Sequence, residues 1–394
     1  MRKIMFMAAF CGAALTSLPA HAASTLPTWA GAWGYAPADS APNEPEQPAG
    51  TYRYRVRLSQ AGDAMQLTLS NAEGDRPLAV SSMTIASPSG PTGTEIGANP
   101  VQAIRFSGSQ SVTLPRGETL VSDPVNAPFR LGQDVIVSVT LATPSRPGRT
   151  NLGIEMAFAP TGANSAFAPI KVRPYLSLVS VRSAAVPCTV VAFGDSITDG
   201  YLALSTQTRG WPGRLAERFA GLPAARRCGV VNMGISGNRV LKPGRATSAL
   251  DRFWRDVASV PNVTHVIFLE GINDIGNAPE SGPDALTPEH LLFGYRQFVA
   301  RAHALGIKVI GATLTPALRA GYMSPAKEKT RQAVNAAIRS GKIFDGVVDF
   351  DAAVRDPAKP ADLRAAFDPG DHLHPNDAGL RAMGDAVSLD LFRR

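Results

Sequence analysis

Five short apolar runs, separated by segments long enough for helices, most strongly constrain the fold of the second half of this chain. The runs cover residues 189–193, 230–233, 265–269, 308–312 and 346–350, and the helix candidates lie near residues 208–220, 247–258, 287–305, 325–340 and 376–391. Strands that alternate with helices pair as a parallel sheet whose faces are covered by helices. Because ligands of such sheets bind beyond the carboxyl ends of the strands, polar residues just after the runs are the candidates for chemistry.

The first half of the chain has the period of β-strands instead. Apolar and polar residues alternate in residues 52–58, 65–69 and 135–141, and clusters of Gly, Pro and Ser at 87–93 and 143–148 separate such runs. Short alternating strands with frequent turns are typical of a sandwich or a jelly roll. We therefore predict an all-β accessory domain over residues 23–185, followed by an α/β domain over residues 186–394.

The N-terminus has the pattern of a secretory signal peptide. Arg2 and Lys3 precede a short apolar stretch over residues 4–15, and Ala20-His21-Ala22 provides the small residues that a signal peptidase needs. The apolar stretch is well short of the ~20 residues that a transmembrane helix requires. We expect residues 1–22 to be removed after Ala22, and the mature protein to be secreted or periplasmic without a transmembrane segment.

The net charge of the chain is positive, but its basic residues are dispersed. The formal charge is +7, and removal of Arg2 and Lys3 with the signal peptide leaves 7 − 2 = +5. A solvated basic surface explains this pattern better than a nucleic-acid site, which would need a clustered patch. We therefore expect no nucleic-acid partner, and the sequence leaves the oligomeric state open.

Four polar or glycine-rich segments stand out in the second half of the chain. They are Gly194-Asp195-Ser196, Gly234-Ile235-Ser236-Gly237-Asn238, Glu270-Gly271-Ile272-Asn273-Asp274 and Asp371-His372-Leu373-His374-Pro375-Asn376. Each segment alone also fits a structural explanation as a turn, a helix cap or a surface loop. All four are expected at successive strand ends of one sheet, in order, which favours a shared site.

These segments contain the parts that ester hydrolysis by serine requires. Ser196 can attack as the nucleophile, His374 can accept its proton, and Asp371 can orient the imidazole from three residues earlier. The backbone N–H groups of Ser196 and Gly237 and the side-chain amide of Asn273 can form an oxyanion hole. Gly237 has no side chain, which allows the backbone to approach a substrate closely.

Two carboxylates are expected to support the site, and one metal hypothesis is set aside. Asp195 is predicted to brace the nucleophile loop through backbone hydrogen bonds, and Asp274 is predicted to support the site, although Asn273 and Asp274 also fit as helix-capping residues. Asp371, His372 and His374 could be read as metal ligands, but metal sites need three or four convergent donors, and no second His or Cys cluster accompanies them. We therefore favour the triad and interpret His372 as a loop residue.

Taken together, the four segments resemble the sequence blocks of the SGNH/GDSL hydrolase family. The matching positions are Gly194-Asp195-Ser196 for its first block, 232–237 for its glycine block, 271–274 for its Gly-x-Asn-Asp block, and Asp371 with His374 for its Asp-x-x-His block. The resemblance covers about residues 188–394 and implies a three-layer α/β/α, flavodoxin-like parallel sheet with no metal or organic cofactor. The Gly-x-Ser-x-Gly elbow of α/β-hydrolases is absent, because Thr198 occupies its last position.

The first half of the chain carries a second resemblance. Residues 69–74 and 120–124 are similar to segments of a β-rich module that precedes some bacterial secreted members of this family, among them predicted carbohydrate O-acetylesterases and arylesterases. The leading hypothesis is a secreted esterase that removes short acyl groups, acetyl in particular, from a glycan or a similar small ester. Two alternatives stay open: a lipase, arylesterase or thioesterase with the same triad, or a glycan-binding protein in which the β-module dominates.

Two cysteines remain after removal of the signal peptide, and we predict that they pair. Cys188 lies eight residues before Ser196, and Cys228 lies nine residues before Gly237. If their strands are parallel neighbours with matched ends, the two cysteines lie opposite each other, where geometry must still permit a disulfide. An oxidising compartment would favour the bond. The alternative is a pair of buried thiols.

Overall fold

The computed structural model describes most of the chain beyond the predicted signal peptide. The described residues are 28–38, 45–146, 154–162, 166–170, 175–183, 188–204, 209–244 and 246–393. The predicted signal peptide, its cleavage after Ala22 and the predicted domain boundary at 185/186 lie outside them.

The N-terminal part is a sandwich of two antiparallel sheets. One sheet has the order β1 (Thr28–Gly34), β12 (Leu176–Ser183), β3 (Gly62–Ser70) and β7 (Thr119–Val121), and β8 (Val125–Phe129) also pairs with β3. The other has the order β11 (Ala168–Pro169), β10 (Met156–Pro160), β2 (Gly50–Arg57), β9 (Asp134–Leu141), β4 (Leu78–Ala86) and β5 (Gln102–Ile104), and β6 (Val112–Leu114) also pairs with β4. Alternate side chains of both sheets enter one apolar core, which confirms the predicted β-rich fold.

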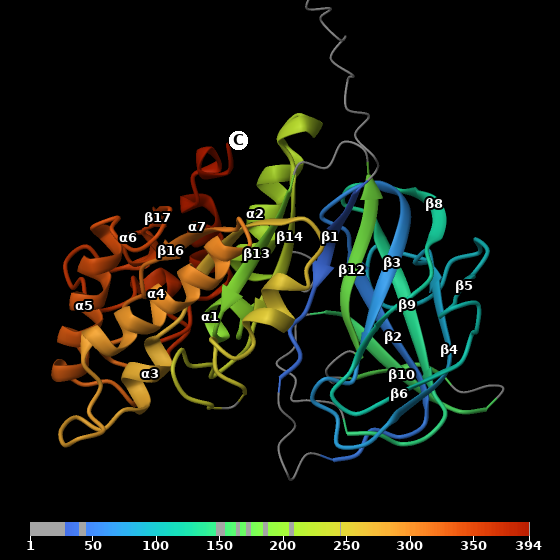
Figure 1. Cartoon of the computed structure of the whole chain (residues 1–394), viewed down its shortest axis with the longest axis horizontal. Coiled ribbons are helices and arrows are strands. Elements are labelled where there is room, and N and C mark those ends of the chain that lie inside the picture. Colours follow the sequence, from blue (N-terminus) through green and yellow to red (C-terminus); the bar gives the residue numbers. More distant parts are fainter. Residues whose placement is uncertain are drawn as a thin grey trace, which may run out of the picture.

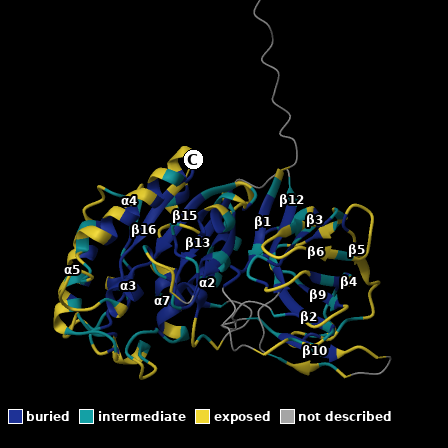
Figure 2. Ribbon diagram, turned by 60° about the horizontal axis from the view of Figure 1, so that its bottom comes forward, coloured by how far each residue is buried: buried dark blue, intermediate teal, exposed yellow. Residues whose placement is uncertain are grey.

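The C-terminal part is built on a five-stranded parallel sheet, also as predicted. Its order is β14 (Cys228–Gly234), β13 (Cys188–Gly194), β15 (Val263–Leu269), β16 (Lys308–Ala312) and β17 (Gly346–Val348). β13 is buried along its whole length, which matches a strand covered on both faces (Figure 2). The strand that follows β13 in the chain, β14, lies on one side of it, and the next strand, β15, lies on the other side. The carboxyl end of β13 is therefore the topological switch point of the sheet.

The helices of this domain pack in pairs over the sheet. They are α1 (Ser196–Asp199), α2 (Gly210–Ala220), α3 (Ile272–Asn277), α4 (Pro288–Ala304), α5 (Pro325–Arg339), α6 (Phe350–Val354) and α7 (Asp377–Ala386). α2 packs with α7, whereas α4 packs with α5 (Figure 1). None of the helices in the described ranges is long and apolar enough to cross a membrane.

Two of the expected helices differ from their predicted extents. The segment near 247–258 forms turns followed by a short π-helix, Trp254–Ala258, and the fully buried side chain of Arg252 lies just before it. The segment near 376–391 is divided, because α7 ends at Ala386 and a separate 3-10 turn covers Leu389–Phe392. α1, α3 and α6 are too short for a period of 3.6 residues to be recognised in the sequence.

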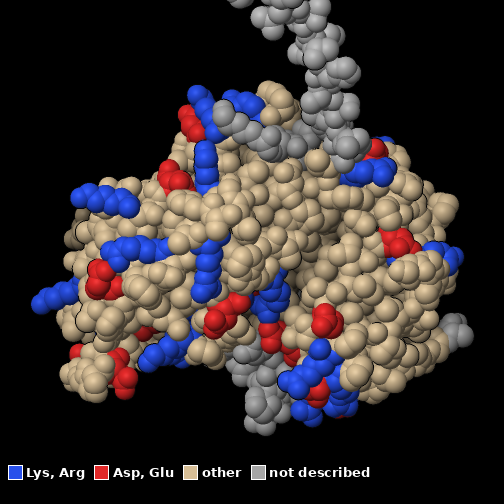
Figure 3. All heavy atoms as spheres, in the orientation of Figure 1, with Lys and Arg blue, Asp and Glu red and all other residues tan. Residues whose placement is uncertain are grey.

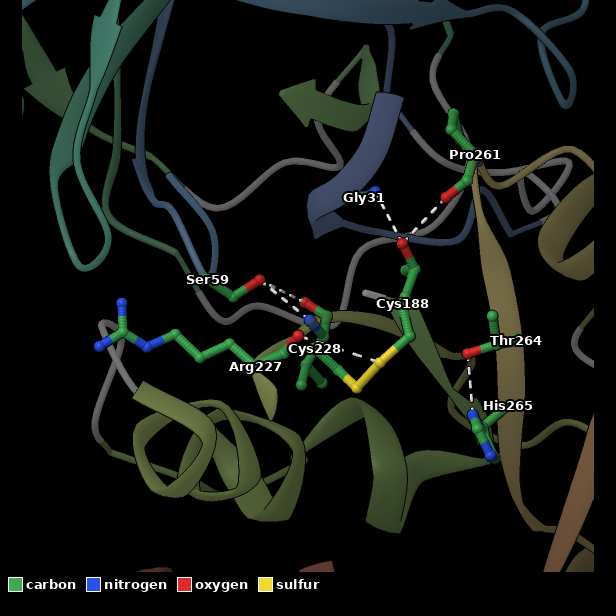
Figure 4. The surroundings of a disulfide bond; sticks show 10 residues. Gly31, Ser59, Cys188, Arg227, Cys228, Pro261, Thr264 and His265 are labelled. Atoms are coloured by element: carbon green, nitrogen blue, oxygen red, sulfur yellow. Dashed lines mark hydrogen bonds between the residues drawn. A yellow bond between two sulfur atoms is a disulfide. The ribbon is translucent and has the colours of Figure 1, made fainter. Parts of the chain in front are cut away.

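The two parts contact each other along β1 and β14 (Figure 1). The Gly31 N–H donates to Thr189 Oγ1 at 3.0 Å, and the Ser59 hydroxyl both accepts from the Val230 N–H and donates to the Val230 carbonyl (Figure 4). A Cβ atom on Gly229 would lie 2.0 Å from the Gly31 carbonyl oxygen, so glycine is required for this close approach.

A disulfide joins Cys188 and Cys228 at the starts of β13 and β14 (Figure 4). The two residues are register partners in the sheet, with their Cα atoms 4.7 Å apart, which is the arrangement that matched strand ends predicted. The bond lies at the end of the sheet opposite the polar segments and beside the contact with the sandwich.

Charged side chains are scattered over the visible surface. On the face shown in Figure 3, lysine and arginine side chains form several separate groups, and acidic side chains lie beside most of them. This distribution agrees with a solvated basic surface and shows no continuous basic stripe on that face.

Candidate active site

The predicted nucleophile lies in a tight turn at the switch point of the sheet. β13 ends at Gly194, the Asp195 side chain accepts from the Ile197 N–H at 2.9 Å, and Ser196 begins α1. A Cβ atom on Gly194 would lie 2.2 Å from Thr198 Oγ1, so glycine is required where the strand meets the helix. The hydrogen bond from Asp195 matches the bracing role predicted for it.

A continuous hydrogen-bonded chain links the serine to the predicted base and carboxylate. Ser196 Oγ lies 2.8 Å from His374 Nε2, and His374 Nδ1 lies 2.6 Å from Asp371 Oδ2. The other carboxylate oxygen of Asp371 accepts the backbone N–H groups of Leu373 and His374 at 3.1 and 3.0 Å. One loop therefore fixes both the carboxylate and the imidazole, as the three-residue spacing predicted.

This loop is not at the end of a strand, which corrects the expectation that all four segments follow strands. It lies between a 3-10 turn, Ala365–Phe367, and α7, more than fifteen residues after β17 ends at Val348. The packing of α7 against α2 carries the loop back toward the serine. The position of the loop thus depends on helix packing, which the apolar runs of the sequence do not predict.

Burial and hydrogen bonding shift the pKa values of the histidine and its partner. Burial lowers the pKa of His374, and the hydrogen bond and charge of Asp371 oppose that shift only in part. Burial alone would raise the pKa of Asp371, but hydrogen bonds from the His374 ring and from two backbone N–H groups hold it below its usual value. At neutral pH the imidazole is therefore neutral and able to accept a proton, while the carboxylate is charged.

The two predicted oxyanion segments lie beside each other and beside the serine turn. The loop after β14 places Gly237 in the left-handed region at φ 77°, which favours glycine. Asn273 Nδ2 donates to the Asn238 carbonyl at 3.1 Å, which leaves its second N–H available. The Ile235 N–H donates to the Gly194 carbonyl at 2.9 Å, so the same loop is tied to the nucleophile turn.

Asp274 supports the loop after β14 rather than acting only as a cap. Its carboxylate accepts the backbone N–H groups of Val240 and Leu241 at 2.8 and 3.3 Å. Burial raises the pKa of Asp274 to about 6, although these two hydrogen bonds lower it in part. The residue therefore joins the asparagine segment to the glycine segment.

His372 belongs to a second aspartate–histidine pair in the loop that holds Asp371 and His374. His372 Nδ1 lies 2.5 Å from Asp368 Oδ2, and the backbone of His372 is left-handed at φ 61°. Asp368 also accepts the Gly370 N–H at 2.9 Å. His372 is thus a loop residue that pairs with Asp368, in agreement with its interpretation from the sequence. No group of three or more His, Cys, Asp or Glu side chains with the placement of a metal site occurs among the described residues.

One buried residue of the site was missed by sequence reasoning. The guanidinium of Arg252 is fully buried and donates to the carbonyls of Gly194 and Met233 at 3.0 and 2.7 Å and to Asn238 Oδ1 at 2.8 Å. It therefore joins the ends of β13 and β14 to the oxyanion loop. In the sequence Arg252 looks like any charged residue of an amphipathic segment, and no local signal marks it.

A second missed residue flanks the triad. The ring of Tyr201 packs against the His374 ring with centroids 4.7 Å apart, and its backbone N–H donates to the Ser196 carbonyl at 2.9 Å. On the oxyanion side, the Tyr322 hydroxyl lies 3.4 Å from Asn273 Oδ1. Two aromatic side chains therefore border the reactive groups.

Comparison with known proteins gives one family match and several similar solved structures. Residues 192–382 match the GDSL-like lipase/acylhydrolase family. Among solved structures, a GDSL-like lipase from Bacteroides thetaiotaomicron shares 22% identity and a TM-score of 0.38 over 52% of this chain and 87% of its own. The acetylxylan esterase Axe2 from Geobacillus stearothermophilus shares 21% identity and a TM-score of 0.41 over 53% of this chain and 96% of its own. Among curated proteins none matches.

Proposed function

Because the C-terminal domain of this chain belongs to the GDSL-like lipase/acylhydrolase family and the protein is an ester hydrolase, we propose that Ser196, His374 and Asp371 are its catalytic triad. The observation that carries the proposal is the unbroken chain from Ser196 Oγ through both ring nitrogens of His374 to Asp371. A nucleophile, a base and an orienting group within hydrogen-bond reach are what acyl transfer through serine needs.

The mechanism follows from this geometry. Ser196 Oγ attacks the ester carbonyl carbon while His374 Nε2 takes its proton, and the N–H groups of Ser196, Gly237 and Asn273 receive the negative charge that develops on the carbonyl oxygen. Collapse of the tetrahedral intermediate breaks the bond to the alcohol, which leaves with the proton from His374. Water, deprotonated by the same imidazole, then releases the acid from the acyl-enzyme.

Substitution of the nucleophile tests the assignment. Ser196→Ala should reduce kcat for p-nitrophenyl acetate by about 10³-fold or more, because it removes the hydroxyl that His374 Nε2 contacts. Thr198→Val, which removes a hydroxyl from the same short helix but not from the triad, is the matched control for folding. A Ser196→Ala variant with wild-type kcat and a native circular dichroism spectrum would refute the proposed mechanism.

We further propose that the acyl group is short, acetyl in particular, and that the alcohol is a carbohydrate. The two tyrosines beside the triad, Tyr201 and Tyr322, support a small acyl group because they take up space next to the reactive atoms. The β-rich module, with its resemblance to those of secreted esterases, supports a glycan. Acetate release from a panel of O-acetylated polysaccharides, compared with rates on p-nitrophenyl esters of increasing chain length, tests both parts. Faster hydrolysis of long-chain esters or of thioesters would favour the alternatives.

Export from the cytoplasm is also proposed. The basic and apolar N-terminus supports it, and so does the Cys188–Cys228 disulfide, because such bonds persist in oxidising compartments. Mass spectrometry of the mature N-terminus, performed on periplasmic and medium fractions, should find Ala23 as the first residue. Recovery of the intact chain from the cytoplasm alone would contradict export.

A further inference from the structure

The sandwich also contacts the α/β domain through a charged residue. Glu73 lies in the turn after β3 and forms an ion pair with Arg255 of the π-helix. Arg255 also donates from Nη2 to the Pro37 carbonyl at 2.8 Å. The side chains of Glu73 and Arg255 are only 18% and 21% exposed, so this interdomain ion pair is largely shielded from water. Two residues of the N-terminal domain thus hold one arginine of the other domain.

From Arg255 the contacts continue into the buried interior. Arg255 forms two hydrogen bonds with the Asp256 carboxylate, at 2.7 and 2.9 Å. The Asp256 side chain is 1% exposed, and its Oδ2 atom also accepts from Arg252 Nη1 at 2.9 Å. Both guanidinium groups therefore share one carboxylate oxygen. A displacement of Arg255 therefore disturbs Asp256, which together with Glu270 supplies the carboxylate partners of the fully buried Arg252.

Arg252 in turn fixes the loop that carries the oxyanion glycine. Its Nε donates to Asn238 Oδ1 at 2.8 Å, and the Asn238 carbonyl accepts from Asn273 Nδ2 at 3.1 Å. Asn238 directly follows Gly237, so one residue links the guanidinium to both loop donors of the predicted oxyanion hole. Buried charge-assisted hydrogen bonds are short and directional, which makes such a chain stiff.

We propose that Glu73 and Arg255 are positioning residues for the oxyanion hole, so that the N-terminal sandwich completes the active site of the esterase. The inference rests on the proposed roles of Gly237 and Asn273. Through Asp256, Arg252 and Asn238, the sandwich restrains the two donors in the place where the oxyanion develops. Preorganised donors stabilise charge in the transition state more than in the bound substrate, so their loss of alignment lowers kcat rather than raising KM.

Glu73→Gln in the full chain tests the inference, because it removes the charge and keeps the shape of the side chain. We expect kcat for p-nitrophenyl acetate to fall on the order of tenfold with little change in KM, which is less than the ~10²–10³-fold cost of removing an oxyanion donor outright. Ser59→Ala is the matched control. It removes a hydroxyl that bonds across the same domain contact and also donates to the Ala32 carbonyl, but its partner across the contact is Val230 in β14 rather than the oxyanion loop.

A second variant guards against a simple folding defect. Arg255→Lys keeps the charge but loses the planar fork that contacts Glu73 and Asp256 together, and it should lower kcat in the same way. The double variant with Glu73→Gln should then be no slower than the slower single variant, because both act through one contact. Thermal unfolding midpoints should fall comparably for Glu73→Gln and Ser59→Ala.

The outcomes separate this inference from the proposed function. Full kcat in Glu73→Gln, or an equal loss of kcat in Ser59→Ala, would overturn the positioning role while Ser196→Ala remained inactive. Activity in Ser196→Ala would instead overturn the triad. A fall in kcat limited to Glu73→Gln and Arg255→Lys, with KM preserved, supports the assignment of the sandwich to the active site.

Discussion

The ring of Tyr201 meets the imidazole of His374 edge to face, with centroids 4.7 Å apart and the ring planes at 60°. Tyr201 is 40% exposed, so it lies partly in contact with solvent while its ring contacts the imidazole. Its backbone N–H donates to the Ser196 carbonyl, which ties the ring to the nucleophile turn. The side chain is therefore placed to restrain the imidazole from one side.

Truncation of this ring should lower catalytic efficiency without abolishing it. An aromatic contact of this kind contributes about 0.5–1.5 kcal/mol, so Tyr201→Ala should reduce kcat/KM by about two- to tenfold. Tyr201→Phe keeps the ring and is expected to retain wild-type kcat on a p-nitrophenyl ester. A Phe variant as impaired as the Ala variant would show that the hydroxyl, and not the ring contact, matters.

The pH dependence of kcat/KM should report the lowered pKa of His374. Because the base must be neutral, activity rises as His374 loses its proton, and the acid limb should lie below the ordinary histidine value of 6.5. Asp371→Asn removes a carboxylate that raises this pKa, so the limb of the residual activity should move to still lower pH. The same variant should reduce kcat by about 10⁴-fold, as loss of the orienting carboxylate does in serine triads.

Asp368→Asn is the matched control for that experiment. It removes the same charge from the same loop, but the charge belongs to the Asp368–His372 pair. Its kcat should fall far less than that of Asp371→Asn, and its acid limb should stay near that of the wild type. Equal losses in the two variants would mean that loop integrity, and not orientation of His374, explains the effect.

The parts of the site that are local in sequence could be predicted from it. Strand periodicity located the five strands, and the spacing of Asp371 and His374 correctly placed both in one loop. The register of β13 and β14 followed from counting residues back from Ser196 and Gly237 to the two cysteines. In each case the structural feature depends on residues that are close in the sequence, so a local pattern is enough to predict it.

The interactions that hold the site rigid could not be predicted in this way. Arg252 and Glu73 are ordinary charged residues in the sequence. Arg252 acquires its contacts only where the ends of β13 and β14 and the loop after β14 converge, and Glu73 meets Arg255 only where the sandwich packs beside the π-helix. The segment near 247–258, expected as a helix, forms turns and a short π-helix, because tertiary contacts of the buried Arg252 override local helix propensity. Tyr201 follows the nucleophile turn closely, but only the position of α7 brings His374 against its ring.

Loss of the disulfide should cost stability without costing activity. Cys188 and Cys228 are 40 residues apart, and a loop of that length predicts a loss of about 4 kcal/mol in the free energy of unfolding. The double variant Cys188→Ala/Cys228→Ala should therefore show a lower urea midpoint. Because the bond lies at the strand starts, away from Ser196, kcat at 25 °C should stay near the wild-type value. Loss of activity in fully folded protein would contradict this separation.

The buried carboxylates beneath the nucleophile turn should make the stability of the protein fall as pH rises. Burial raises the pKa of Asp195 to about 7, and burial also raises the pKa values of Glu270 and Asp274. A carboxyl group with a raised pKa in the folded state binds its proton more tightly there than in the unfolded chain. Its stabilising contribution is therefore fully present below the unfolded value near 3.8 and is lost as pH rises through the folded value.

We accordingly expect the thermal unfolding midpoint to decrease between pH 5 and pH 8, by about 2–4 °C for each kcal/mol lost. Asp195→Asn cannot ionise but keeps an oxygen that can accept the Ile197 N–H, so it should flatten this slope and be relatively more stable at pH 8. Asp284→Asn, at a side chain that is 78% exposed, should leave the slope unchanged. If Asp195→Asn instead kept the wild-type slope, Glu270 and Asp274 would carry the pH dependence, because they are the remaining buried carboxyl groups with raised pKa values beside the turn.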